Sequence, residues 1–278
     1  MKKKIGIVFY FLGVIAVLIS FTIPVHITSG KTMNDTEENE IFEDNRSDKD
    51  YIETDGEALE KGEKVKKIAY LTFDDGPSKN TSKILKILKK YNVKATFFVN
   101  GKPIYKDMYI RINKEGHKIG NHTYCHEYNE IYTSVEDFKS DVNKLNRLLI
   151  EYGIKPNYML RFPGGSNNTV SEKYGGKIIM DELVQVMSEE GYKYYDWNVT
   201  SGDAATAAFS AEEIVEKVTE DVVKYKTSVV LLHDADDKQA TVEALDPLIE
   251  ALEAMNAEIL PIDDDTQAIQ YVRIDSAE

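Results

Sequence analysis

A (β/α) barrel with about seven parallel strands is the fold that this 278-residue sequence predicts. From residue 65 onward, short apolar runs alternate with helix-patterned stretches, which is typical of parallel strands joined by helices. Polar side chains suited to catalysis follow five of these runs, each at the carboxyl end of a strand. A barrel gathers those ends on one face, whereas an open α/β sheet spreads them along an edge. The pattern therefore favours the barrel.

Seven apolar runs are the predicted strands. Their lengths suit strands rather than helices. They cover residues 67–73, 95–99, 117–120, 158–162, 192–197, 228–232 and 258–262.

Helices are predicted between the strands, where apolar residues recur at i, i+3, i+4 and i+7. Two such helices carry Ile84, Leu85, Leu88 and Tyr91, and Phe138, Val142, Leu145 and Leu149. The spacings of Ser134 with Asp137 and of Ser210 with Glu213 also predict capping boxes, in which each side chain bonds the other residue's backbone N–H.

The N-terminus has the pattern of a membrane anchor. Three lysines at positions 2–4 precede an uncharged apolar run over residues 5–25, close to the roughly 20 residues that span a bilayer. A cleaved signal peptide has a shorter apolar region of about 7–15 residues, so residues 1–30 favour an uncleaved single-pass anchor, with secretion after cleavage as the alternative. The lysines predict a cytoplasmic N-terminus and an extracellular remainder.

An acidic linker is predicted to follow over residues 31–64, where 13 acidic residues outnumber 5 basic ones. Such a segment lacks the apolar periodicity of a folded domain and is expected to be disordered. The net charge of -14 for the whole chain argues against a nucleic-acid partner. Residues 65–278 form the predicted globular domain, expected as a monomer, and Cys125 as the single cysteine excludes an intrachain disulfide.

A histidine pair is the strongest indication of a metal site. His122 and His126 are four residues apart, which puts two imidazoles on one side of a helical turn. An isolated pair of this spacing is common and carries little weight alone. Asp75 completes a set of two histidines and one carboxylate with open positions, which suits catalytic zinc and also non-haem iron.

Two further groups provide acid–base chemistry. Asp74 and Asp75 precede Gly76, and alone they indicate an ordinary turn. With distant histidines, one carboxylate can bind metal while the other accepts a proton from water. His233 ends an apolar strand, where a buried core histidine is the simpler interpretation, and His117 lies inside a predicted strand and is expected to be structural.

Four segments together resemble the polysaccharide deacetylase family, which is also called the NodB-homology domain and carbohydrate esterase family 4. They are residues 72–77 (TFDDGP), 116–126 (GHKIGNHTYCH), 161–165 (RFPGG) and 231–233 (LLH), in the order that the family has them. The resemblance covers about residues 65–270, and residues 95–99 (ATFFV) resemble the family's second strand. It implies a distorted barrel and a metal-dependent N-deacetylase of amino-sugar polymers.

The resemblance assigns the reacting groups by position. Asp74 is implied to be the catalytic base, oriented by Arg161. Asp75, His122 and His126 are implied to bind one divalent metal ion. Zinc is the favoured ion, and cobalt or nickel suits the same ligands.

The remaining roles follow from the same resemblance. His233 is implied to be the general acid, oriented by Asp203. The backbone N–H of Gly164 is implied to stabilise the oxyanion, and Leu231 to wall the acetyl pocket. Two positions depart from the family pattern, because Ala204 stands where tryptophan is usual and Gly164 where an aromatic residue is frequent. Both departures are expected to open the cleft to a bulkier sugar.

The sequence thus predicts a membrane-anchored deacetylase that faces the cell wall and acts on its glycan, with peptidoglycan (N-acetylglucosamine or N-acetylmuramic acid) as the favoured substrate. Another polymer, such as chitin-type or exopolysaccharide N-acetylglucosamine or acetylxylan, is the alternative among enzymes. A non-catalytic glycan-binding module would have no need of both Asp74 and His233. An iron oxygenase with the same ligands would leave these two residues unexplained.

Overall fold

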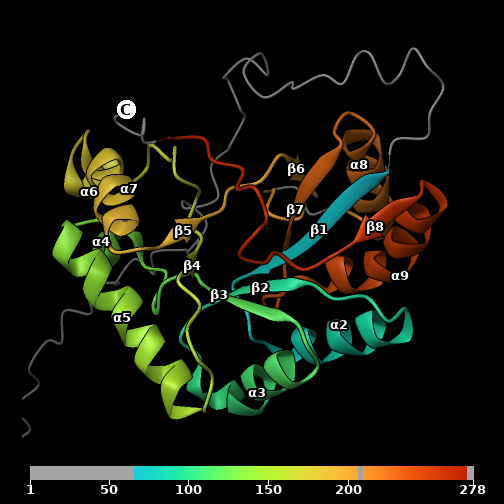
Figure 1. Ribbon diagram of the computed structural model, residues 1–278, viewed down its shortest axis with the longest axis horizontal. Helices are drawn as coiled ribbons and strands as arrows, with labels where there is room; N and C mark the ends of the chain where they lie inside the picture. Colours follow the sequence, from blue (N-terminus) through green and yellow to red (C-terminus); the bar gives the residue numbers. More distant parts are fainter. Residues whose placement is uncertain (1–65, 206–208, 274–278) are drawn as a thin grey trace, which may run out of the picture. The chain divides into compact units, whose positions relative to one another are not determined.

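The computed structural model describes residues 66–205 and 209–273. Within them, eight strands form one parallel sheet in the order β5-β4-β3-β2-β1-β7-β6, with β8 also paired to β1 (Figure 1). The strands are β1 (Lys67–Asp74), β2 (Thr96–Val99), β3 (Lys118–Asn121), β4 (Met159–Leu160), β5 (Lys193–Tyr194), β6 (Val199–Thr200), β7 (Thr227–His233) and β8 (Ala257–Ile259). The predicted parallel α/β class is confirmed, with one strand more than the seven expected.

Strand β1 is the centre of this sheet. It pairs with β7 from Ile68 to Asp74 along one edge. The other edge is divided, because β8 pairs with residues 67–69 and β2 pairs with residues 72–74. Most of β1 and β7 is buried, which explains their continuous apolar sequences, since both faces of a parallel sheet are covered.

The sheet curls into an incomplete barrel. Strands β5 and β6 stand at opposite ends of the strand order, yet only residues 195–198 separate them in the chain. The segment over residues 193–200 therefore pairs first with β4 and then with β7. The two ends of the sheet are joined by this covalent connection and not by strand pairing, which is why the barrel is incomplete. The prediction of a single strand over residues 192–197 was wrong, because the passage changes neighbours midway and β6 was missed.

Helices connect the strands. They are α2 (Lys79–Lys90), η3 (Pro103–Tyr105), α3 (Lys106–Lys114), α4 (Tyr128–Ile131), α5 (Val135–Glu151), α6 (Glu172–Gly175), α7 (Ile179–Glu189), α8 (Ala211–Val222) and α9 (Gln239–Ala254). The Ser210–Glu213 capping box is present at α8. At α5 only half of the predicted box forms, because the Asp137 carboxylate accepts from the hydroxyls of Ser134 and Thr133 instead of reaching back to the backbone.

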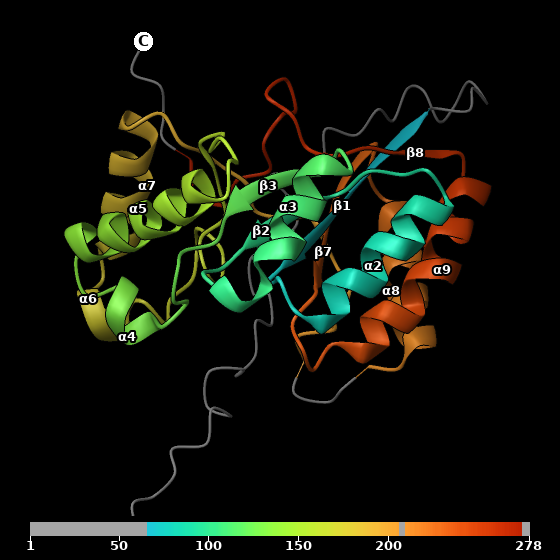
Figure 2. The ribbon, with the colours of Figure 1, turned by 90° about the horizontal axis from the view of Figure 1, so that it is seen from below.

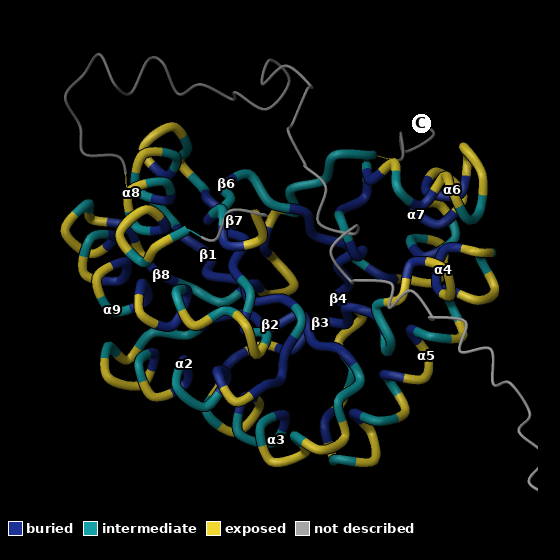
Figure 3. The backbone as a smooth tube through the Cα atoms, turned by 180° about the vertical axis from the view of Figure 1, so that it is seen from behind, coloured by how far each residue is buried: buried dark blue, intermediate teal, exposed yellow. Residues whose placement is uncertain are grey.

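The helices lie in two groups against the sheet (Figure 2). In one group, α2, α8 and α9 pack together against β1 and β7, and in the other, α5 and α7 pack beside β4. Figure 3 shows the buried backbone along the strands and the exposed positions on the outer sides of the helices. The apolar positions predicted to face the core are buried in α2 and α5, except Tyr91, which follows the last turn of α2.

The predicted anchor at residues 1–30 and the acidic linker at residues 31–64 lie outside the described residues. Among the helices of residues 66–205 and 209–273, none is long and apolar enough to span a bilayer.

Candidate active site

The candidate residues gather where the parallel strands end. Asp74 and His233 are the last residues of β1 and β7, and the ladder pairs them directly. His122 follows β3 by one residue and Arg161 follows β4 by one residue. Because these strands are parallel and neighbouring, their carboxyl ends bring the four side chains to one face, as the barrel prediction required.

Three of the side chains form a cluster that fits a metal ion. The Oδ1 atom of Asp75 lies 3.6 Å from Nε2 of His122 and 3.4 Å from Nε2 of His126. One ligand atom from each residue lies within 4.8 Å of the others. Asp75 Oδ1 is buried and has no hydrogen-bond partner within the described residues, and a buried polar oxygen without a partner is costly unless a ligand satisfies it.

The two histidines are brought together by a loop, not by the helical turn that their spacing predicted. Residues 122–127 lie between β3 and α4 outside any helix. Thr123 and His126 adopt left-handed backbone conformations, with φ of 65° and 61°, which non-glycine residues seldom adopt. The imidazole rings of His122 and His126 are 5.0 Å apart between centroids.

Helix α5 holds this loop through Asp141, a residue that sequence reasoning missed. Its Oδ1 atom accepts from the backbone N–H of Cys125 at 3.1 Å and also from that of Tyr124. The only sequence indication is an acidic residue on the face of α5 toward β3, and acidic residues are common on helices. Burial raises the pKa of the Cys125 thiol to about 12, so this thiol is neutral and unreactive at physiological pH.

Hydrogen bonding fixes the tautomer of His122. Its Nδ1 atom lies 2.8 Å from the backbone oxygen of Arg161, which can only accept. Nδ1 therefore carries the proton, and the lone pair of Nε2 is directed at Asp75. Burial lowers the pKa of His122 despite the Asp74 carboxylate, which keeps the imidazole neutral as a metal ligand must be. Burial opposes the charge on Asp75, but His126 and His233 outweigh it and hold its pKa below the usual range.

Arg161 and Asp74 form a buried ion pair. The guanidinium is 0% exposed and the carboxylate-bearing residue 2% exposed, and Nη1 donates to Asp74 Oδ1 at 2.9 Å. The same guanidinium donates to the hydroxyl of Thr72 at 2.7 Å and to the backbone oxygens of Tyr195 at 2.9 Å and Asp196 at 3.2 Å. Five donors in a planar fork suit this arrangement. The other Asp74 oxygen, Oδ2, lies 3.7 Å from Nε2 of His122, one of the three candidate metal ligands.

His233 is oriented by Asp203. Nδ1 of His233 lies 2.7 Å from Asp203 Oδ1, and the His233 backbone N–H donates to Oδ2 at 2.8 Å. Thr241 donates its hydroxyl to the same Oδ2 at 2.8 Å. Burial opposes the charged imidazole, but the Asp203 carboxylate outweighs burial and raises the pKa of His233 to about 9. Asp203 follows β6, the strand that the sequence did not reveal.

The other two predicted residues occupy the same face. Gly164 lies half-buried on the loop after β4 with φ of 78°, a conformation that glycine adopts without strain. Leu231 is buried in β7 beside Thr72 and Thr200. Ala204, one of the two departures from the family pattern, is exposed next to Asp203.

His117 lies apart from the site. It precedes β3 rather than lying within it, and its Nδ1 accepts from the backbone N–H of Ala95 at 3.1 Å. Burial lowers its pKa to about 4. The imidazole is therefore neutral and structural, as predicted.

Two charged residues beneath the turn after β1 were also missed. Lys102 donates from Nζ to the backbone oxygen of Asp75 at 2.6 Å. Asp234 is fully buried, accepts from the Thr81 hydroxyl, and has its pKa raised to about 7 by burial. A Cβ atom on Gly76 would lie 2.2 Å from both Asp234 carboxylate oxygens. The aspartate therefore accounts for glycine at that position.

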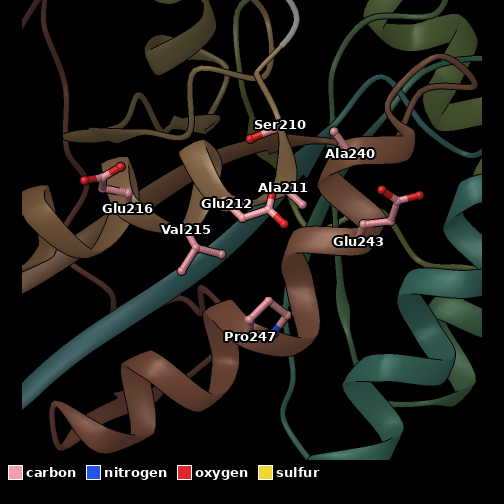
Figure 4. Close-up of a pocket in the computed structure, with 8 residues that line it drawn as sticks. All are labelled: Ser210, Ala211, Glu212, Val215, Glu216, Ala240, Glu243 and Pro247. Carbon is pink, nitrogen blue, oxygen red and sulfur yellow. The ribbon is translucent and has the colours of Figure 1, made fainter.

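A separate cavity of about 610 Å³ lies between α8 and α9 (Figure 4). It is lined by residues such as Glu212, Glu216, Glu243 and Pro247, and none of the predicted site residues lines it. The candidate acid–base and metal-binding groups lie at the face formed by the strand ends.

Known proteins are similar to this chain in sequence. Residues 61–194 match the family model described as polysaccharide deacetylase. A peptidoglycan-N-acetylglucosamine deacetylase of Bacillus cereus is 31% identical over 179 residues, which cover 62% of this chain and 61% of that protein. A second Bacillus cereus protein of the same name is 32% identical over 194 residues, covering 67% of this chain and 82% of the relative. The chain thus spans less than two thirds of the first relative.

A solved structure has the same fold. The catalytic domain of peptidoglycan N-acetylglucosamine deacetylase from Eubacterium rectale is 40% identical, with a TM-score of 0.71. The match covers 76% of this chain and 94% of that domain. Sequence, fold and the four motifs agree, and this chain belongs to the polysaccharide deacetylase family.

Proposed function

We propose that this protein is a metal-dependent hydrolase that removes N-acetyl groups from the amino sugars of a cell-wall glycan, with N-acetylglucosamine of peptidoglycan as its substrate. One observation carries the proposal: the unpartnered Asp75 oxygen faces two imidazoles, between a carboxylate held by Arg161 and an imidazole held by Asp203. The relatives named as peptidoglycan-N-acetylglucosamine deacetylases support the substrate.

Asp75, His122 and His126 would hold the metal ion. One carboxylate and two neutral imidazoles suit zinc, with cobalt or nickel also compatible. When bound, the ion supplies a Lewis acid that polarises the acetamide carbonyl and acidifies a water molecule.

Asp74 acts as the general base that accepts a proton from the attacking water. Arg161 occupies Oδ1 of this carboxylate, so Oδ2, which lies 3.7 Å from His122 Nε2, is the oxygen available to the water. The charge that develops on the acetyl oxygen is stabilised by the backbone N–H of Gly164. Leu231 forms the apolar wall beside the acetyl methyl group.

His233 acts as the general acid. Its Nδ1–H stays bonded to Asp203, so Nε2–H is the proton that passes to the departing nitrogen as the C–N bond breaks. The pKa of about 9 keeps the imidazole protonated at neutral pH, as an acid must be before it reacts. One water is consumed, and the products are acetate and a sugar with a free amine.

Two features bear on the substrate and the location. Gly164 and the exposed Ala204 provide no aromatic wall, which leaves room for a bulkier sugar and keeps N-acetylmuramic acid, with its lactyl-peptide, as the alternative to N-acetylglucosamine. Residues 1–30 anchor the chain in the membrane and residues 31–64 space the catalytic domain, a monomer, from its outer surface. Protease shaving of intact cells tests this location, because a cytoplasmic domain would be protected.

Acetate release by the full chain tests the function, with peptidoglycan, chitin oligomers and acetylxylan as substrates and with zinc, cobalt or a chelator added. Metal-dependent release from peptidoglycan is the expected result, and mass spectrometry of the digested product identifies the deacetylated sugar. Release only from chitin oligomers or acetylxylan would move the substrate to another polymer. No release from any polymer by metal-loaded protein would contradict the proposal.

A further inference from the structure

Asp196 is a buried carboxylate that has no role in the reaction proposed above. It nevertheless contacts Arg161 and the loop that carries Gly164. The residue is 1% exposed. Its Oδ1 atom accepts from the backbone N–H of Ser166 at 2.8 Å, and Oδ2 accepts from the Ser166 hydroxyl at 2.6 Å and from the backbone N–H of Tyr271 at 2.8 Å. Burial raises the pKa of this carboxyl above its usual range, against these hydrogen bonds.

The Ser166 contacts anchor the loop that carries Gly164. This loop follows β4 and has two successive left-handed glycines, Gly164 and Gly165, with φ of 78° and 84°. On the side before Gly164, the Tyr132 hydroxyl donates to the backbone oxygen of Pro163 at 2.7 Å. On the side after it, Asp196 holds Ser166. The two glycines are therefore held between two anchored residues. Tyr132 anchors Pro163 before them, and Asp196 anchors Ser166 after them.

The backbone of Asp196 contacts the other catalytic group. Its carbonyl oxygen accepts from Nη2 of Arg161 at 3.2 Å, and the same guanidinium holds Asp74 at 2.9 Å. Its N–H donates to the backbone oxygen of Ile269 at 2.8 Å. These contacts arise because Asp196 lies between the last backbone bond to β4, which Tyr195 donates, and the first backbone bond to β7, which Asn198 donates. The peptide group of Asp196 therefore bonds to other partners.

We propose that Asp196 is a positioning residue that fixes the Gly164 loop relative to Arg161 and Asp74, an inference that rests on the deacetylase function proposed above. The carboxylate sets where the Gly164 N–H points, and the carbonyl of the same residue sets where the guanidinium lies. The Gly164 N–H, and Asp74 that the guanidinium holds, are proposed to act on the transition state and not on the bound sugar. Loss of the carboxylate is therefore expected to lower kcat and to leave KM nearly unchanged.

Asp196→Asn is the test variant, in the full chain. The amide keeps the size of the side chain and one acceptor oxygen, but an NH₂ group in place of Oδ2 cannot accept from the Ser166 hydroxyl or from the Tyr271 N–H. We expect kcat to fall about 10- to 100-fold, because a displacement of about 1 Å near the reacting atoms has effects of that order. KM should change less than about threefold, and the bound metal per chain should not change.

Tyr194→Phe is the matched control. It removes the hydrogen bond from the Tyr194 hydroxyl to the backbone oxygen of Val272. Val272 follows Tyr271, so both variants remove a hydrogen bond to the same C-terminal segment. If loosening that segment were the cause, this control would lose as much activity as Asp196→Asn. We expect the control to keep its kcat within about twofold, because its loss leaves the Ser166 contacts intact.

Hydrogen exchange gives a readout independent of turnover. In Asp196→Asn, exchange of peptides covering residues 163–168 should rise about tenfold, while exchange in β1 and β7 stays unchanged. Unchanged exchange at residues 163–168, or an unchanged kcat, would overturn the proposal, as would an equal loss in Tyr194→Phe. Wild-type protein that releases no acetate would overturn the function instead, and the exchange result would still decide whether Asp196 anchors the loop.

Discussion

Asp74 and His233 are directly paired in the ladder between β1 and β7. The proposed base and the proposed acid therefore stand side by side at the ends of adjacent strands. The two residues have different partners, since Arg161 holds Asp74 and Asp203 holds His233. The following predictions concern the metal ligands beside this pair, the two partners, and the turn that follows β1.

Removal of one metal-ligating side chain should strongly weaken metal binding. Asp75→Ala and His126→Ala each delete one of three ligand atoms and are expected to weaken zinc binding at least about 100-fold, since even outer partners of metal ligands are worth about 10- to 100-fold. Zinc content after dialysis is the measurement. Glu127→Gln, an exposed neighbour of His126, is the control and should bind one ion. Full zinc content in Asp75→Ala would show that the ion binds elsewhere.

The alkaline limit of activity should depend on Asp203. The carboxylate raises the pKa of His233 to about 9, and a general acid loses activity as pH rises through its pKa. Asp203→Asn removes that charge, so the alkaline limb of kcat against pH should move to lower pH by at least about one unit. Asp237→Asn, at an exposed position of the loop that follows His233, should leave the limb in place. An unmoved limb in Asp203→Asn would mean that another group is the acid.

Arg161 should matter for both stability and rate. Arg161→Met leaves the buried Asp74 carboxylate without its ion-pair partner, and loss of one partner of a buried pair costs about 3–5 kcal/mol. We expect a lower denaturation midpoint in urea, together with loss of acetate release. Arg147→Met, at an exposed position of α5, should change neither. A variant at Arg161 with wild-type stability would contradict the burial of this pair.

Gly76 should be required because of Asp234. A Cβ atom would overlap both carboxylate oxygens, so Gly76→Ala is expected to destabilise the fold by about 1–3 kcal/mol and to lower metal affinity through the adjacent Asp75. Combining it with Asp234→Ala removes the overlap, and the double variant should be more stable than the sum of the single effects predicts. Strict additivity in urea unfolding would refute the steric explanation.

The long strands, and the gathering of the candidate site residues at their ends, could be predicted from the sequence. Strands β1 and β7 have continuous apolar sequences because both faces are buried, and their predicted ends differ from the structure by a residue. The residues at their ends, Asp74, Asp75 and His233, were recognisable because the four motifs together resemble the polysaccharide deacetylase family. Taken singly, the two aspartates indicated an ordinary turn and the histidine a buried core residue.

Other features could not be predicted because they depend on contacts between distant residues. Strand β6 has two residues, too few to show a period. The His122–His126 spacing indicated a helical turn, and nothing in the sequence reveals that Thr123 and His126 are left-handed. Asp141 and Asp196 act through backbone groups far along the chain, and a backbone partner leaves no pattern in the sequence.

The most direct test of the proposed chemistry is Asp74→Asn. The amide keeps the shape of the side chain and can still accept from Arg161 through its oxygen, but it cannot take a proton from water. Metal content and acetate release from peptidoglycan are measured on the same preparation of the full chain. We expect one bound ion per chain with kcat reduced at least about 100-fold, in the range expected for loss of a general base. Near-normal acetate release with the ion still bound would contradict the assignment of Asp74 as the base.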